Sequence, residues 1–192
     1  EHLEKVTLLV VDKTGTLTEG KPKFVDLLPS DGFDARELLS LAASLEQNSE
    51  HPLAAAIVLG AKDQKLTLDE VKDFRSVTGG GVIGSVKGRV VIVGKPDFLR
   101  HVNVTGLEPL EATAVKLQED GKTAMFVAID GKPAGILAVA DPIKVTTVEA
   151  IKDLHTLGLK IVMLTGDNPH TAQAIAAQVG IDQARGDLLP TD

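Results

Sequence analysis

Apolar runs alternate with amphipathic stretches at both ends of the chain. Residues 6–11 (VTLLVV) are almost wholly apolar, and residues 160–164 (KIVML) are similar. Residues 146–157 and 169–179 carry apolar side chains at helical spacing instead. Continuously apolar strands that alternate with helices are typical of a parallel sheet covered on both faces. The two ends of the chain therefore predict a doubly wound α/β unit.

The middle of the chain has a different pattern. Residues 35–46 and 52–62 are predicted helices, and a third helix is expected near 110–119. Short alternating strands surround the third helix, with turns at 87–88 (Lys-Gly) and 130–131 (Asp-Gly), which favour hairpins. This pattern predicts an antiparallel α+β unit, and its place in the chain makes it an insertion.

Three segments follow from this reading. Residues 1–24 are the first part of the α/β domain, residues 25–138 form the inserted domain, and residues 139–192 complete the α/β domain. No internal repeat or low-complexity tract interrupts this order.

Net charge, cysteine content and the length of the apolar runs exclude several classes of function. The net charge is −7, which argues against a sequence-independent nucleic-acid binder, because such proteins present a basic surface. Cysteine is absent, so thiolate metal sites and disulfides are excluded. No apolar run approaches the roughly 20 residues of a membrane span. A polyphosphate ligand would need backbone amides or a metal ion to offset the acidic charge.

Two glycine-rich stretches resemble nucleotide-binding motifs but lack their context. GGGVIG at 79–84 fits a dinucleotide fingerprint, yet it leads into an alternating strand pattern rather than a helix. GKT at 121–123 resembles a phosphate loop, but Lys116 stands where that motif requires its first glycine. The strand context argues against a dinucleotide site at 79–84, and the missing glycine excludes a phosphate loop at 121–123.

The first apolar strand ends in a carboxylate. Asp12 follows residues 6–11 directly, and the polar turn 13–16 comes next. Open α/β sheets bind ligands at the carboxyl ends of their strands, and a turn rich in free amides can hold an anion. A carboxylate beside a phosphate implies that a Mg²⁺ ion bridges them or that the carboxylate is the nucleophile. Asp12 as a simple cap is the remaining alternative.

The second apolar strand ends in a similar way. Thr165, Gly166, Asp167 and Asn168 follow it, and Pro169 then begins a helix. Thr165 would present its hydroxyl, and the helix its free amides, at the same sheet edge as Asp12. An ordinary helix cap by Asp167 or Asn168 is compatible with this phosphate site.

These stretches resemble a known family. DKTGTLTEGKP at 12–22 resembles the phosphorylation motif of the P-type ATPases, cation pumps of the haloacid dehalogenase superfamily. TGDN at 165–168 and DPIK at 141–144 resemble the next motifs, in the family's order. The resemblance covers the whole chain and implies a phosphorylation domain at both ends with a nucleotide-binding domain between them.

The resemblance also implies roles. Asp12 would attack the γ-phosphoryl of ATP, and Mg²⁺ would be held by the Asp12 carboxylate and the Thr14 backbone carbonyl. Thr165 would hold the transferred phosphoryl, and Asp167 would position the Mg-nucleotide. Lys13 would support the site without an assigned role, and Asp141 would lie near the hinge between the domains.

The middle of the chain indicates a subfamily. SEHPLAAAI at 49–57 resembles the His-Pro motif of the heavy-metal-transporting pumps. The resemblance implies six nucleotide-binding residues: Glu46, Glu50, His51, Gly79, Gly81 and Gly94. Glu46 and His51 would contact the adenine, while the glycines would let the nucleotide approach the backbone. Lys95 departs from the family, which has Asn there, so a contact at Gly94–Lys95 is in doubt.

The expected function is therefore the ATP-binding and aspartyl-phosphorylation portion of a heavy-metal pump, with Cu(I) as the transported ion and ATP and Mg²⁺ as cofactors. The pump would lie in the cell membrane with this portion, expected to be monomeric, on the cytoplasmic side. Its partners would be the pump's membrane helices and actuator domain. The chain would stop before a catalytic lysine and a distal Mg²⁺ carboxylate, which would leave it able to bind ATP but with little hydrolysis.

Two other functions are open. One is a haloacid dehalogenase-type phosphatase with an inserted cap domain. Such phosphatases usually carry a second aspartate two residues after the nucleophile, and Thr14 stands there instead. The other is a nucleotide-binding module without chemistry of its own.

Overall fold

The structure is a computed structural model, and it describes residues 6–188. The chain divides into two compact units. Unit 1 contains the chain up to residue 21, residues 116–123 and the chain from residue 141 onward. Unit 2 contains residues 22–115 and 124–140. Each unit has its own sheet and its own hydrophobic core.

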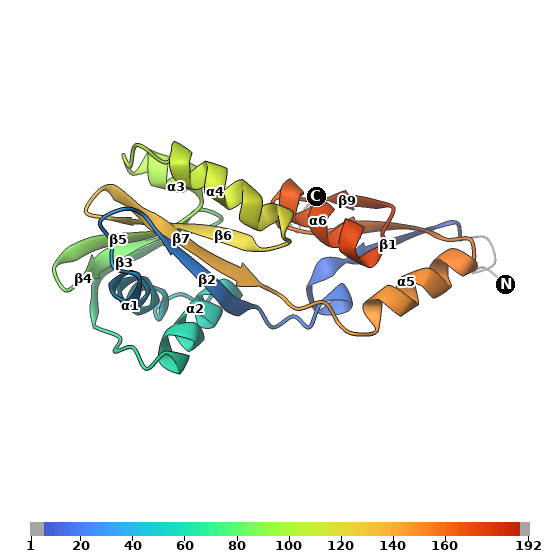
Figure 1. Ribbon diagram of the computed structural model, residues 1–192, viewed down its shortest axis with the longest axis horizontal. Coiled ribbons are helices and arrows are strands. Elements are labelled where there is room, and N and C mark those ends of the chain that lie inside the picture. The colour runs from blue at the N-terminus through green and yellow to red at the C-terminus, as the bar shows by residue number, and fades with distance from the viewer. Residues whose placement is uncertain (1–5, 189–192) are drawn as a thin grey trace. The chain divides into compact units, whose positions relative to one another are not determined.

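Unit 1 is built on a parallel sheet of strand order β1-β8-β9 (Figure 1). Its strands and helices are β1 (Leu8–Asp12), α5 (Thr147–Thr156), β8 (Lys160–Leu164), α6 (Pro169–Val179) and β9 (Gln183–Arg185). The predicted α/β pattern at the two ends of the chain is confirmed. Leu8 and Lys160, which are 152 positions apart in the sequence, thus become neighbours in one sheet.

One face of this sheet carries the core of unit 1. Ile161 and Met163 are fully buried there, packed with residues of both helices, including Ile151 and Ile175. The opposite face differs from expectation, because Leu8 and Val10 are 51% and 53% exposed. The continuous apolar run predicted cover on both faces, but among the described residues α5 and α6 contribute to a single core.

Unit 2 is a six-stranded sheet of order β2-β7-β6-β5-β4-β3, and its observed pairings are antiparallel. Its strands are β2 (Lys23–Pro29), β3 (Val71–Val77), β4 (Gly81–Val86), β5 (Arg89–Gly94), β6 (Thr123–Ile129) and β7 (Lys132–Ala140). Its helices are α1 (Ala35–Glu46), α2 (Pro52–Asp63), α3 (Pro96–His101) and α4 (Glu108–Glu119), the last of which runs into the segment counted with unit 1. Helices α1 and α2 cover one face of the sheet, and α3 lies on the other (Figure 1).

Local sequence explains where these elements turn and begin. Both predicted hairpin turns form, with positive φ at Lys87, Gly88, Asp130 and Gly131, as tight two-residue hairpins require. Helix α1 begins after Asp34, whose carboxylate accepts a hydrogen bond from the Glu37 amide at 2.9 Å. The predicted mixed α/β fold with a separate antiparallel sheet is therefore confirmed. No helix within residues 6–188 is long and apolar enough to cross a membrane.

Candidate phosphorylation and nucleotide-binding sites

The first candidate site lies at the carboxyl end of the parallel sheet. Asp12 is the last residue of β1 and pairs in register with Leu164, the last residue of β8. The turns that follow the two strands therefore leave the sheet at the same edge. One irregular helical turn, Lys13–Leu17, follows β1, with Gly15 at φ 75°. Residues 165–168 follow β8.

An ion pair joins the two turns. Lys13 is buried, with 7% of its side chain exposed, and its ammonium group pairs with the carboxylate of Asp167, whose side chain is 16% exposed. Thr165 adds a second contact, because its hydroxyl donates to Asp167 Oδ2 at 3.0 Å. The Asp167 amide in turn donates to Thr165 Oγ1 at 3.2 Å. The structure thus brings together three of the predicted residues of this site.

Asp12 stands apart from this network. Its residue is exposed, and among the described residues its carboxylate has no hydrogen bond or ion pair. Burial and pairing of Lys13 with Asp167 leave the Asp12 oxygens open to a ligand. A carboxylate that is close to a sheet edge but unpaired can act as a nucleophile or as a metal ligand.

The donors near Asp12 fit a magnesium ion. Mg²⁺ prefers oxygen ligands and is usually held by one or two carboxylates together with water and substrate phosphates. The Asp12 carboxylate and the Thr14 backbone carbonyl, on an exposed residue two positions later, supply ligands of this kind. Within residues 6–188 no group of three or more His, Cys, Asp or Glu side chains could hold a metal ion on its own.

The second candidate site lies in unit 2, around the turn from α1 to α2. Glu46 is the last residue of α1 and only 3% exposed. Burial raises the pKa of Glu46 to about 7, and a hydrogen bond from the Ser49 side chain opposes part of this rise. At neutral pH this carboxyl group is therefore divided between its protonated and ionised forms, so it can donate or accept a hydrogen bond.

His51 begins α2, with Pro52 as the first helical residue. Its Nδ1 accepts a hydrogen bond from the Leu53 amide at 3.1 Å, and this contact caps the helix. An accepting Nδ1 assigns the proton of the neutral ring to Nε2. The exposed ring therefore presents an N–H donor, while Glu50 beside it is also exposed.

The three predicted glycines differ from one another. Gly81 and Gly94 pair in register across β4 and β5. A Cβ on Gly81 would lie 2.3 Å from the Val93 carbonyl oxygen, and one on Gly94 would lie 2.5 Å from the Gly80 carbonyl oxygen; both would also meet the Phe98 ring. The fold itself therefore requires these two glycines. Gly79 has φ 72° and open space at its Cβ position, so only its surroundings are free for a ligand.

One contact relates this glycine turn to the turn between α1 and α2. A Cβ on Gly84 would lie 2.9 Å from the Leu45 side chain, so the carboxyl end of α1 crosses β4. Gly84 lies three residues after Gly81 on that strand, which corresponds to about 10 Å. Leu45, the residue before Glu46, thus packs against the same strand, β4, that begins at Gly81.

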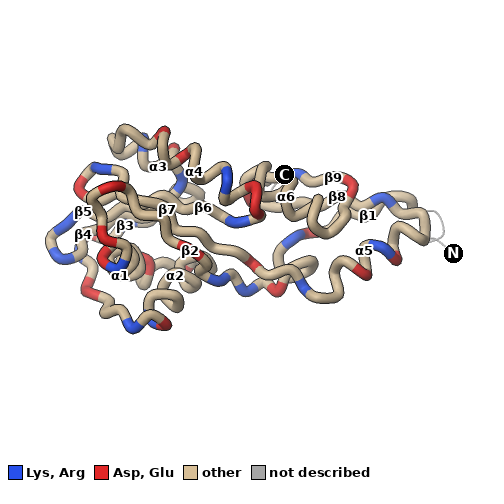
Figure 2. Tube along the Cα trace, in the orientation of Figure 1, with Lys and Arg blue, Asp and Glu red and all other residues tan. Residues whose placement is uncertain are grey.

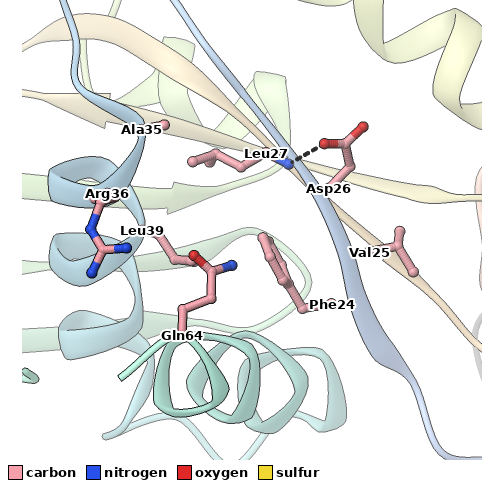
Figure 3. A pocket seen from close by; sticks show the side chains of 8 residues that line it. All are labelled: Phe24, Val25, Asp26, Leu27, Ala35, Arg36, Leu39 and Gln64. Atoms are coloured by element: carbon pink, nitrogen blue, oxygen red, sulfur yellow. Dashed lines mark hydrogen bonds between the residues drawn. The ribbon is translucent and has the colours of Figure 1, made fainter. Parts of the chain in front are cut away.

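Two cavities lie elsewhere. One, of about 230 Å³, lies between β2 and the helices α1 and α2, where Arg36 and Gln64 approach the apolar side chains of Phe24 and Leu39 (Figure 3). The other, of about 270 Å³, is lined by the turn between α3 and α4. Neither is lined by a residue that the sequence motifs single out.

Sequence reasoning missed two residues that contact the turn after β1. Thr18 is fully buried and its hydroxyl donates to Asp141 Oδ2 at 2.6 Å, while Lys144 Nζ donates to the Gly15 carbonyl at 2.6 Å. Both residues lie inside motifs quoted for the resemblance, DKTGTLT and DPIK. The motifs indicated their importance, but only the fold shows that they contact each other's segments.

The fold and the motifs agree with the comparisons with known proteins. Residues 6–192 match the family model described as haloacid dehalogenase-like hydrolase. The chain belongs to the haloacid dehalogenase-like hydrolases.

Individual relatives within this family are heavy-metal pumps. The chain is 47% identical to copper-transporting ATPase 1 of Rhizobium meliloti strain 1021, over 99% of the chain and 23% of that protein. A zinc-transporting PIB-type ATPase in its E2.Pi state matches 99% of the chain at 36% identity with a TM-score of 0.73, covering 30% of that structure. The catalytic domain of the CPx-ATPase CopB-B matches 99% at 27% identity with a TM-score of 0.71, covering 64% of that structure.

These matches confirm the resemblance drawn from the motifs. The chain is similar along nearly its whole length to the phosphorylation and nucleotide-binding portion of heavy-metal P-type ATPases, several of them copper exporters. It spans about a quarter of the length of the curated relatives that it matches. ATP and Mg²⁺ are used by this class of protein in general.

Proposed function

We propose that the chain binds ATP through unit 2 and accepts its γ-phosphoryl group on Asp12 of unit 1, as part of a Cu(I)-transporting pump. The observation that carries this proposal is the Asp12 carboxylate. It is exposed and unpaired among the described residues, and it ends a parallel strand beside the turn that holds Thr165 and Asp167. Thr14, where a phosphatase would carry its acid, favours a stable phosphoenzyme.

In this mechanism an Asp12 oxygen attacks the γ-phosphorus in line. The new bond forms between Asp12 and phosphorus as the bond to the ADP oxygen breaks, and ADP leaves with that electron pair. Mg²⁺, held by Asp12 and the Thr14 carbonyl, would neutralise charge on the phosphoryl oxygens. Thr165 and the amides of residues 13–15 would hold the phosphoryl group. The ion pair with Lys13 fixes the Asp167 side chain, so that Asp167 can position the Mg-nucleotide.

Unit 2 would hold the adenine. The Nε2–H of His51 can donate to a ring nitrogen, and Glu46 can pair with the amino group. Gly79 would leave room for the nucleotide against the backbone, while Gly81 and Gly94 would contribute by letting their two strands and the Phe98 ring pack closely beside it. Glu50 lies at the rim of the same turn. Unit 2 in this proposal corresponds to the nucleotide-binding domain, expected at residues 25–138.

The phosphoryl-transfer step is tested in the full-length pump that contains this chain. We expect acid-stable incorporation of the γ-phosphate label that depends on Mg²⁺ and is removed by hydroxylamine, as for an acyl phosphate. Asp12→Asn should abolish it, because an amide is not a nucleophile. Asp26→Asn, an exposed aspartate on β2, is the matched control. Label retained by the Asp12 variant would show that another residue is phosphorylated.

The binding step is tested on the chain itself by titrating ATP against backbone amide NMR signals. Shifts should concentrate at residues 46–51 and 79–81. His51→Asn keeps a side chain that can cap α2 but removes the ring N–H, and it should weaken binding by about 1 kcal/mol, the net value of one hydrogen bond. Unperturbed signals in both segments at saturating ATP would contradict the proposal.

The transported ion and the pump's other parts belong to the same proposal. The copper-transporting relatives support Cu(I) as the transported ion. The similar zinc-transporting structure makes Zn²⁺ the alternative ion within the same class of pump. The partners would be the membrane helices and the actuator domain of the pump, with this portion on the cytoplasmic side.

A further inference from the structure

The segment that follows β7 is hydrogen-bonded along its length to the turn that follows β1. We call this pair of segments, residues 141–147 and 13–21, the clasp. Its backbone bonds run from the Glu19 amide to the Pro142 carbonyl at 2.8 Å and from the Lys144 amide to the Leu17 carbonyl at 3.0 Å. The Thr147 hydroxyl also donates to the Leu17 carbonyl at 2.7 Å. These bonds close the clasp without any charged side chain.

Two charged side chains of the clasp reach the turn as well. Asp141 accepts from the Thr18 hydroxyl at 2.6 Å and from the Lys21 amide at 3.0 Å. Lys144 Nζ donates to the Gly15 carbonyl at 2.6 Å. Thr18 Oγ1 in turn accepts from the Gly15 amide at 3.3 Å. Both polar backbone groups of Gly15 are therefore held, the N–H through Thr18 and the carbonyl by Lys144.

Holding these two groups orients the peptide planes on either side of Gly15. A trans peptide is planar, and its carbonyl points away from its N–H. The Thr14 carbonyl must therefore point away from Thr18, because the Gly15 amide points toward it. The Thr16 amide must likewise point away from Lys144, which holds the Gly15 carbonyl. Gly15 has φ 75°. Glycine can leave this conformation for others at little cost, so without these hydrogen bonds the peptide planes on either side of Gly15 could rotate.

We propose that Lys144 and Asp141 are positioning residues for phosphoryl transfer to Asp12. Asp141 orients the Thr14 carbonyl through Thr18, and Lys144 directs the Thr16 amide. The inference rests on the proposed function and deepens it, because it assigns the orientation of the turn to side chains from a segment more than 120 residues away. Neither side chain touches the reacting atoms.

A purely structural role would make a different prediction. When the ammonium group of Lys144 is removed, the clasp keeps its three bonds between uncharged groups and the two bonds of Asp141, and water can replace the ammonium group at the exposed Gly15 carbonyl. Loss of Lys144 should therefore change the turn and its metal affinity while leaving the fold stable. Partners that orient metal ligands typically contribute 10- to 100-fold to metal affinity.

The test uses the isotope-labelled full chain with four sequences: the unchanged chain, Lys144→Met, Lys144→Arg and the control Lys152→Met, an exposed lysine on α5. NMR records the Gly15 carbonyl and Thr16 amide signals, the apparent Mg²⁺ dissociation constant from shifts of residues 12–16, and ATP shifts in unit 2. Urea unfolding gives the stability of each chain.

We expect Lys144→Met to move the Gly15 and Thr16 signals and to weaken Mg²⁺ binding about tenfold or more. Lys144→Arg should restore both, the control should change neither, and all four should unfold at similar urea concentrations. Asp141→Asn, measured as a fifth sequence in the same way, should also weaken Mg²⁺ binding.

Three outcomes would overturn the inference. Equal Mg²⁺ affinity in the unchanged and Met chains refutes the inference alone. If the Lys144→Met chain binds Mg²⁺ more weakly only in proportion to its loss of stability toward urea, the role of Lys144 is purely structural. An unchanged chain whose turn ignores Mg²⁺ contradicts the metal site of the proposed function, and the inference with it.

Discussion

Glu46 is a single residue whose chemistry depends on where the chain puts it. At the end of an apolar helix it is almost fully buried, and desolvation raises its pKa to about 7. The exposed Glu50, four residues later, experiences no such burial. The family resemblance assigns both residues to the nucleotide site, so the difference in burial between them could not be predicted from the sequence.

The raised pKa makes stability depend on pH. Because the folded chain holds its proton more tightly than the unfolded chain, Glu46 contributes stability that is complete below about pH 4.5 and is lost as pH rises through about 7. Glu46→Gln removes this dependence. At pH 8 the variant should be more stable by up to about 3 kcal/mol, and at pH 4.5 the two chains should be close.

Urea unfolding followed at several pH values measures this effect. Glu50→Gln is the matched control and should leave the pH profile of the original chain unchanged. Parallel profiles for the original chain and Glu46→Gln between pH 4.5 and 8 would mean that the folded protein does not raise the pKa of Glu46.

At the scale of elements, local signals in the sequence predicted much of the fold. Pro52 and Pro169 mark helix starts, and both hairpin turns lie where Lys-Gly and Asp-Gly predicted them. The β2–β7 pairing had no such signal, since it joins strands more than 100 residues apart and includes an irregularity between Phe24 and Asp26. Long-range pairings of this kind depend on how the whole sheet packs rather than on local pattern.

The glycines of β4 and β5 show the same limit. The GGG sequence at 79–81 suggests a ligand-binding loop. Gly81 in it, and Gly94 on the neighbouring strand, are instead required because the two strands and the Phe98 ring lie so close together. A sequence pattern records that a side chain is absent, but not whether backbone, a ring or a ligand occupies its place. For Gly79 the open surroundings leave the ligand interpretation standing.

This distinction predicts different effects of alanine at the three positions. Gly81→Ala and Gly94→Ala force a Cβ to within 2.6 Å of backbone atoms and should each destabilise the chain by about 3 kcal/mol. Gly79→Ala meets no neighbour and should cost only about 1–2 kcal/mol for its positive φ. Urea unfolding compares the three chains.

Gly88→Ala, at a hairpin turn with φ 76° and similar open space, is the control for the cost of positive φ alone. A Gly81→Ala chain as stable as Gly79→Ala would show that the strands can separate to admit a methyl group. Until stability is known, weaker ATP binding by Gly81→Ala is no evidence of a lost ligand contact.

At the scale of the whole molecule, nucleotide binding is proposed for unit 2 and phosphorylation for unit 1, and each unit has its own hydrophobic core. The core of unit 2 gathers residues of α1, α2 and the antiparallel sheet, while that of unit 1 gathers residues of α5, α6 and the parallel sheet. Lysines, arginines and carboxylates are distributed over both units (Figure 2), so the net charge of −7 does not belong to one of them alone.

The separate cores predict that unit 2 folds by itself. A fragment of residues 22–140 contains the whole of the unit 2 core and the β2–β7 pair, whose register brings Lys23 beside Ala140 near the fragment's two ends. Closing the fragment therefore needs no residue of the parallel sheet. We expect cooperative unfolding and ATP shifts at residues 46–51 and 79–81 that match those of the full chain, with a dissociation constant within about threefold, or about 0.7 kcal/mol.

Heteronuclear NMR and ATP titration of the fragment and the full chain make this comparison, with the His51→Asn fragment as the control for binding at the proposed site. A folded fragment that binds ATP much more weakly than the full chain would show that unit 1 supplies part of the affinity. A fragment that lacks dispersed amide signals would show that unit 2 depends on the rest of the chain to fold, because the residues of its own core do not outweigh the conformational entropy lost on folding.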